Sequence, residues 1–306
     1  SYVELAPPLT LCYCFGMSNV NIFKTRYLRK LASTSSFSDA WQVWEPEIRA
    51  KLSNNPTGSE ILDLGDSLSD IFQANATSGR AQSSLVGGGA AWECLISWYL
   101  NLICWDIPVM VIKQNKSFVP QTINDVLAVT ISNSQTNTES DIIIFSVPLD
   151  NALQGSTLTN LNDHMKVRLD EVVLVNLQCK TNWNDNAQVP MLWDMIYNSD
   201  SRLPNISVGI NGVSPQSVGK FRYGFVTVPT VKLSKIKSTS LAVLRVKNMT
   251  GGNYWGHSSK QDVASSIKEL PNRNFSSFFT GGISSHIDRT ILNDPDYLEK
   301  FLTLQW

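Results

Sequence analysis

The sequence predicts an α/β protein with a central mixed β-sheet flanked by helices and an N-terminal helical subdomain. Two patterns support this class. Residues 20–80 space their apolar positions near the 3.6-residue period of a helix, whereas short β-branched runs bounded by Pro, Asn and Ser dominate after residue 107. The 306 residues are 42% hydrophobic and 17% charged, which allows a sizeable buried core.

The helical subdomain is predicted to occupy residues 1–80. It contains the segments "FKTRYLRKLA", "FSDAWQVWEPEIRAKL" and "GSEILDLGDSLSDIFQANA". The Gly- and Ser-rich stretch "TSGRAQSSLVGGG" follows and marks a loop, so we expect an α/β domain over residues 81–306. That domain opens with an apolar helix from Ala90 to Trp105, in which Glu93, Ser97 and Asn101 form one polar stripe at i, i+4 and i+8.

The central sheet is predicted from four runs, "PVMVIK", "DVLAVTIS", "DIIIFSVP" and "EVVLVNLQCKT". The near-continuous apolar character of the last three is typical of strands buried on both faces. "PMLWDMIYN" begins with Pro190, which favours the start of a helix that crosses the sheet. Downstream we expect strands at "SVGI", "FRYGFVTVP" and "LAVLRVKN", a helix at "DVASSIKEL" and a terminal helix in "DPDYLEKFLTLQW".

Composition narrows the class of protein. No apolar run reaches the ~18 residues that cross a bilayer, and a net charge of −1 gives no overall attraction to polyanions. Five cysteines without a C-x-x-C pair favour reduced thiols and a cytoplasmic protein. Five N-x-S/T sequons leave open a secreted carbohydrate- or receptor-binding protein, although Asn- and Ser-rich chains produce such triplets by chance.

Polar residues gather near the ends of two predicted strands. Asp141 begins "DIIIFSVP", and Gln178 and Lys180 end "EVVLVNLQCK". Because side chains alternate along a strand, Gln178 and Lys180 share a face. Neighbouring strands would therefore bring an acid, an amide and an ammonium together at one rim of the sheet. Each residue alone also suits a structural role, as a strand-entry acid, an edge amide or a solvated strand end.

This arrangement resembles the PD-(D/E)xK nuclease superfamily, and in particular its type II restriction endonucleases. Asp141 matches the strand-borne aspartate, and Gln178-Cys179-Lys180 matches a variant of the D/E-x-K tripeptide on the next strand. Glu93 matches the glutamate that many members carry on a preceding helix. The resemblance covers roughly residues 90–200 and departs from the family at Gln178, where a carboxylate is usual.

The resemblance implies a Mg²⁺-dependent endonuclease that cleaves double-stranded DNA at specific sites. Asp141, Glu93 and the Cys179 carbonyl would hold the metal, because Mg²⁺ prefers oxygen ligands. Lys180 would orient or deprotonate the attacking water, and Gln178 would complete the shell. The missing carboxylate leaves an alternative open, a noncatalytic module with a degenerate nuclease fold that binds nucleic acid or protein.

Partners follow from the same resemblance. We expect DNA contacts from Lys113, Asn182 and Asn184, a homodimer that cuts both strands, and a companion DNA methyltransferase in the host. The segments "KLSKIKSTS" and "RVKNMTGGNYWGHSSK" also concentrate Lys, Arg, Asn and aromatic residues typical of groove contacts, although polar surface loops share this composition.

Overall fold

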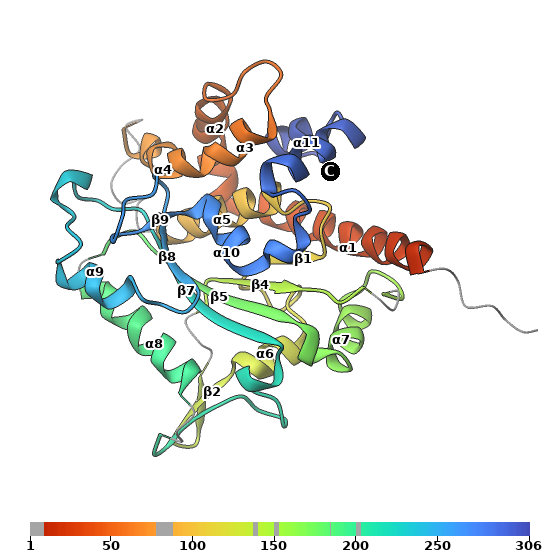
Figure 1. Cartoon of the computed structure of the whole chain (residues 1–306), viewed down its shortest axis with the longest axis vertical. Coiled ribbons are helices and arrows are strands. Elements are labelled where there is room, and N and C mark those ends of the chain that lie inside the picture. Colours follow the sequence, from red (N-terminus) through yellow and green to blue (C-terminus); the bar gives the residue numbers. More distant parts are fainter. Residues whose placement is uncertain (1–8, 78–87, 137–139, 150–152, 184, 200–202) are drawn as a thin grey trace, which may run out of the picture.

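The computed structural model describes residues 9–77, 88–136, 140–149, 153–183, 185–199 and 203–306. A six-stranded mixed sheet runs through its centre (Figure 1). The strand order is β1-β4-β5-β7-β8-β9, with antiparallel pairing up to β5 and parallel pairing beyond it. The strands span β1 Val109–Lys113, β4 Ile142–Ser146, β5 Val173–Lys180, β7 Lys220–Thr227, β8 Gly252–Trp255 and β9 Ser265–Ser266.

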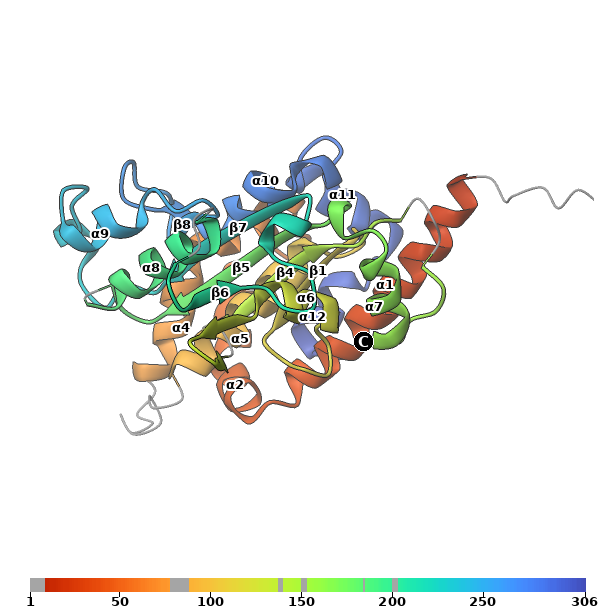
Figure 2. The ribbon, with the colours of Figure 1, turned by 90° about the horizontal axis from the view of Figure 1, so that it is seen from below.

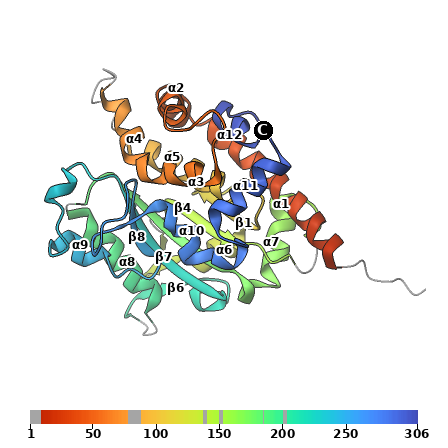
Figure 3. The same ribbon diagram turned by 45° about the horizontal axis from the view of Figure 1, so that its top comes forward.

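Helices cover the sheet, as the sequence predicted. Figure 3 shows the N-terminal helices and the C-terminal helices gathered on one side around α5. These helices are α1 Leu9–Ala32, α2 Ser35–Arg49, α3 Gly58–Asp63, α4 Leu68–Thr77, α5 Gly88–Ile103, α10 Leu270–Phe275, α11 Ile283–Asn293 and α12 Tyr297–Thr303. The α/β class with a mixed sheet flanked by helices is therefore confirmed.

A second, smaller layer lies on the opposite face of the sheet. Strands β3 (Ser134–Thr136), β2 (Val129–Ile131) and β6 (Ile206–Val208) form a three-stranded antiparallel sheet. Figure 2 shows β6 and α6 crossing in front of the central strands. The remaining helices of the described chain are α6 Gln121–Leu127, α7 Leu158–Lys166, α8 Gln188–Asn198 and α9 Leu241–Val246.

The boundary near residue 80 stays a prediction. Buried side chains on both sides of it belong to one hydrophobic core, which includes Trp44 from α2, Trp92 from α5 and Phe145 from β4. Among the described residues, no helix is long and apolar enough to cross a membrane.

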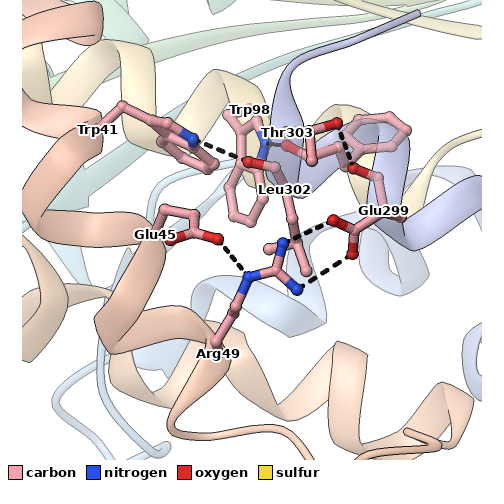
Figure 4. Close-up of polar contacts among 8 residues, drawn as sticks. Trp41, Glu45, Arg49, Trp98, Glu299, Leu302 and Thr303 are labelled. Atoms are coloured by element: carbon pink, nitrogen blue, oxygen red, sulfur yellow. Dashed lines mark hydrogen bonds and ion pairs between the residues drawn. The ribbon is translucent and has the colours of Figure 1, made fainter.

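The N- and C-terminal helices are joined by a polar contact (Figure 4). The Arg49 guanidinium on α2 donates to both carboxylate oxygens of Glu299 on α12, at 3.0 and 2.7 Å, and also pairs with Glu45. The Trp41 indole N–H donates to the Leu302 carbonyl at 3.0 Å, and that of Trp98 to the Phe301 carbonyl at 3.1 Å. Residues at opposite ends of the chain are thus held together by directed bonds.

One predicted strand is wrong, and a second is confirmed only over Val129–Ile131, which lies in the three-stranded sheet and not in the central one. "LAVLRVKN" forms helix α9, in which Val243 and Val246 are buried while Leu241 and Leu244 are exposed. That three-residue spacing is helical and does not alternate as a strand would. "DVLAVTIS" is divided between the end of α6 and β2, because the chain leaves the helix at Ala128, whose backbone is extended. Both runs are rich in Val and Leu, which pack equally well in either structure.

"DVASSIKEL" was predicted as a helix, and this is also wrong. The segment holds the two-residue strand β9, which pairs with β8, followed by a single 3₁₀ turn over Ile267–Glu269. The pairing of Tyr254 with Ser265 and of Trp255 with Ser266 supplies the backbone partners that a helix would have supplied locally.

Candidate active site

The two edges of β5 pair with different strands, β4 on one edge and β7 on the other. The Val228 N–H donates to the Lys180 carbonyl at 3.2 Å, so even-numbered residues of β5 bond to β7 through their backbone. The backbone groups of odd-numbered residues therefore point toward β4. Side chains alternate independently between the two faces of the sheet, which puts Gln178 and Lys180 on one face and Cys179 on the other.

Asp141 lies where β4 separates from β5. The ladder between these strands ends at the pair Ile142–Leu177. One residue further on, the Asp141 carboxylate accepts a hydrogen bond of 2.7 Å from the Cys179 N–H, in place of a backbone carbonyl. Because the N–H and C=O of a strand residue point to the same side, the Cys179 carbonyl is directed to the side on which Asp141 lies. An acid and a carbonyl thus meet at this fork.

Glu93 reaches the same region from α5. Its carboxylate forms an ion pair of 2.8 Å with the Lys113 ammonium at the end of β1, and both side chains are largely buried. The polar stripe of α5 does not face solvent. Ser97 shares a hydrogen bond with the Tyr27 hydroxyl, and Asn101 donates to the Ser97 and Val111 carbonyls, each at 2.8 Å. The stripe instead fixes α5 against β1 and α1, and thereby positions Glu93.

The Cys179 thiol lies in the field of four charged groups. Burial raises its pKa well above the usual value, and the Asp141 and Glu93 carboxylates raise it further. The ammonium groups of Lys113 and Lys180 act in the opposite direction. The charges of Glu93, Asp141, Lys113 and Lys180 thus all act on the thiol near the end of β5, and their role as one site stays a prediction.

Lys113 is held in its charged form. Burial lowers the pKa of its ammonium, but the hydrogen bond that it donates to Glu93 and the charges of Glu93 and Asp141 outweigh this, so the pKa lies above its ordinary value. Its backbone N–H donates to the Tyr27 hydroxyl at 2.7 Å. The sequence marked Lys113 as a DNA contact, whereas the structure shows it paired with Glu93. The run "PVMVIK" gave no sign of this partner.

Gln178 lies apart from the carboxylates. Its side chain is fully buried on the face covered by α8, and its Oε1 accepts a hydrogen bond of 3.0 Å from the Tyr223 hydroxyl on β7. Tyr223 in turn stacks on Tyr197 of α8. In the described part of the chain, the amide of the neighbouring Asn176 is also fully buried and has no hydrogen-bond partner. The place of Gln178 in a metal shell stays a prediction.

Two other predicted DNA contacts follow β5. Asn182 is half-buried, two residues beyond the end of the strand. Asn184 lies outside the described residues. Between them Trp183 is buried and stacks on Trp255 of β8, so this turn packs against the sheet.

The donors at the fork fit a hard divalent cation in their chemical type. Asp141 and Glu93 supply carboxylate oxygens, and the Cys179 carbonyl supplies a third oxygen, which are the ligand types that Mg²⁺ prefers. In the described ranges, no group of three or more His, Cys, Asp or Glu side chains is arranged to hold a metal. A metal here would therefore depend on two carboxylates, a backbone carbonyl and water.

Comparison with known proteins adds no further information, since no family model matches the sequence and no curated protein matches it.

Proposed function

We propose that the protein is a Mg²⁺-dependent endonuclease that hydrolyses phosphodiester bonds of double-stranded DNA. One observation supports this most strongly. The Asp141 carboxylate lies at the fork between β4 and β5, bonded to the backbone of Cys179. Helix α5 brings Glu93 to the same region, so the aspartate, the glutamate and the lysine come from the helix and the two neighbouring strands that the nuclease resemblance implies.

Each residue has a proposed role. Asp141, Glu93 and the Cys179 carbonyl would hold the metal, which supplies an activated water and neutralises charge on the phosphate. Lys180 is the last residue of β5, and its charge acts on the Cys179 thiol beside the fork. There it would orient the attacking water and stabilise developing negative charge. Lys113 would fix the orientation of Glu93.

The proposal extends to the setting of the reaction. Cutting both strands at a two-fold symmetric sequence requires two sites, so we propose a homodimer, acting beside a DNA methyltransferase that protects host DNA. We place the protein in the cytoplasm. Cys94, Cys104 and Cys179 are free buried thiols, consistent with a reducing compartment.

The test is cleavage of a long unmethylated duplex by the purified protein, with Mg²⁺ or with chelator. We expect discrete Mg²⁺-dependent fragments, and at least a thousandfold slower cleavage by Asp141→Asn, since a metal ligand contributes several kcal/mol to the transition state. The matched control is Asp163→Asn, which removes an exposed carboxylate on α7. Intact DNA over a wide range of metals and salt would overturn the proposal, and so would equal loss in both variants.

A second candidate is a noncatalytic binding module. Two observations favour it: Gln178 brings no charge and is bonded to Tyr223, and Glu93 is already neutralised by Lys113. Calorimetric titration with Mg²⁺ and Mn²⁺ distinguishes the two. Binding that is lost in Asp141→Asn supports the nuclease, whereas DNA binding with no metal binding supports the module.

A further inference from the structure

Charge is unevenly distributed along this nearly neutral chain. Between Asp200 and Asp262 the sequence has nine Lys and Arg residues and no Asp or Glu. Of the 25 basic and 26 acidic residues in the whole chain, the remaining part therefore holds 16 basic and all 26 acidic ones. The protein thus combines one strongly basic segment with an acidic remainder, which its net charge of −1 conceals.

Part of this segment forms a basic arm, which we define as Lys232, Lys235, Lys237, Arg245 and Lys247. The three lysines between β7 and α9 are exposed, and the two residues at the end of α9 are half-buried. In the portion of the chain that the structure covers, none of the five forms an ion pair with a carboxylate. Their charges are therefore available to an external partner.

The loop that carries the arm is anchored. Lys260 donates through its ammonium to the Leu233 and Ile236 carbonyls, each at 2.8 Å. Ile236 is buried between two exposed lysines, and Gln73 of α4 donates to the Pro229 carbonyl at 3.3 Å. Lys260 thus anchors the loop through hydrogen bonds, whereas Lys235 and Lys237 on that loop are exposed. A fixed loop loses less conformational entropy when its lysines bind a ligand.

The basic arm starts at the rim of the candidate active site. Thr227, the last residue of β7, pairs with Lys180, the last residue of β5, and the next N–H bonds to the Lys180 carbonyl. The chain then runs directly into the arm. Figure 1 shows the segment in cyan around α9, beside α8. The arm therefore leaves the same end of the sheet at which Asp141 and Lys180 lie.

We infer that the basic arm binds the phosphate backbone of duplex DNA and directs it toward the fork at Asp141, an inference that rests on the proposed nuclease function. Charge complementarity supports this partner, because lysine ammonium groups without acidic partners bind phosphates and release counterions. The excess of acidic over basic residues in the rest of the chain would disfavour contact with the same backbone elsewhere. Phosphate contacts position a duplex without reading its sequence.

The test measures binding separately from cleavage. A fluorescently labelled duplex of about 20 base pairs is titrated with the full chain in chelator, so that no metal-dependent cleavage occurs, at several salt concentrations. The triple variant Lys232→Gln, Lys235→Gln, Lys237→Gln should weaken binding about ten- to a hundredfold at 0.1 M salt and lower the salt slope by about 3. The matched control, Lys30→Gln, Lys51→Gln, Lys166→Gln, removes three exposed lysines elsewhere and should change neither.

The outcomes separate this inference from the nuclease proposal. If DNA binding depends on the basic arm but no Mg²⁺-dependent cleavage occurs, the inference about the basic arm holds and the nuclease proposal fails. If the protein cleaves DNA but both triple variants bind with equal salt slopes, the inference about the basic arm fails and the nuclease proposal holds. Preference for RNA, or binding to vesicles containing phosphatidylserine instead of DNA, would also overturn the inference. The vesicle experiment is needed because Leu241 and Leu244 are exposed between these basic residues.

Discussion

The two faces of β5 carry opposite kinds of polar chemistry. On the α5 face, Cys179 lies among the charges of Glu93, Asp141 and Lys113. On the α8 face, Asn176 and Gln178 present neutral amides in a fully buried layer, and the charge of Lys180 comes only at the end of the strand. The charged groups lie at the fork, where Glu93 and Lys113 remain 18% and 25% exposed and have each other as partners.

This difference teaches why an amide occupies position 178. A carboxylate there would be fully buried beside Tyr223, whose hydroxyl already donates to the amide oxygen of Gln178. Burying an ionised group without a partner costs far more than burying an amide that accepts a hydrogen bond. Full burial at position 178 therefore favours an amide over a carboxylate.

The largest expected effect concerns the two lysines that flank the fork. In the proposed nuclease, Lys180→Ala should slow cleavage by about a hundred- to a thousandfold, because it removes a group that acts on the water and the developing charge. Lys113→Ala should cost about tenfold, as expected for a residue that only orients Glu93. Single-turnover cleavage measures both. The reverse order would assign the catalytic lysine to the α5 face.

A second prediction concerns the α8 face alone. Gln178→Glu should lower the free energy of unfolding by about 3 kcal/mol at pH 8, because it buries a carboxylate beside Tyr223. Burial raises the folded pKa of such a group above its unfolded value of about 4.3, so the loss should grow as pH rises and shrink toward pH 4.

Urea unfolding at pH 5 and pH 8 checks this, with Gln178→Met as the uncharged control of similar size. A Gln178→Glu protein that is as stable as the original and binds Mg²⁺ more tightly would show that position 178 reaches the metal site after all.

A smaller effect is expected for the ion pair on the α5 face. A double-mutant cycle with Glu93→Gln and Lys113→Met should give a coupling of about 1–2 kcal/mol, because both partners are mostly removed from water. The pKa of Lys113 is raised in the folded state. The coupling should therefore be complete at pH 7 and be lost as pH rises through that raised value. Chemical denaturation from pH 7 to 11.5 measures it, and a coupling near zero at pH 7 would contradict the pairing.

The smallest effect should come from the Cys179 thiol. Its backbone carbonyl is the proposed ligand, so Cys179→Ala should leave the cleavage rate within about threefold and cost about 1 kcal/mol of stability for the lost buried atoms. Burial raises the thiol pKa well above its usual value, so Cys179 should resist iodoacetamide at pH 8 until the protein unfolds. Mass spectrometry of labelled peptides follows the reaction. Rapid labelling of the native protein would show that the site is open.

Local sequence patterns predicted much of the fold but only part of the candidate site. The polar stripe of α5 and the apolar run ending at Lys180 are local features, so α5 and β5 were predictable, and so was the nearness of Asp141 to the end of β5. The interaction partners of the site residues were not predictable. The bond from Tyr223 to Gln178 depends on the register of β7, and the Glu93–Lys113 ion pair depends on how α5 crosses β1. Neither register nor crossing is encoded within a short window of sequence.

The contact between α2 and α12 has a consequence for how this protein is made. The indole of Trp41 finds its carbonyl partner at Leu302, 261 residues later in the chain. During synthesis at about 5–20 residues per second, the first helices would leave the ribosome long before their last partners exist. Trp41 and its neighbours would then be exposed while the rest is translated, and contacts this distant in sequence close slowly. We expect the nascent chain to need chaperone protection until α12 has emerged.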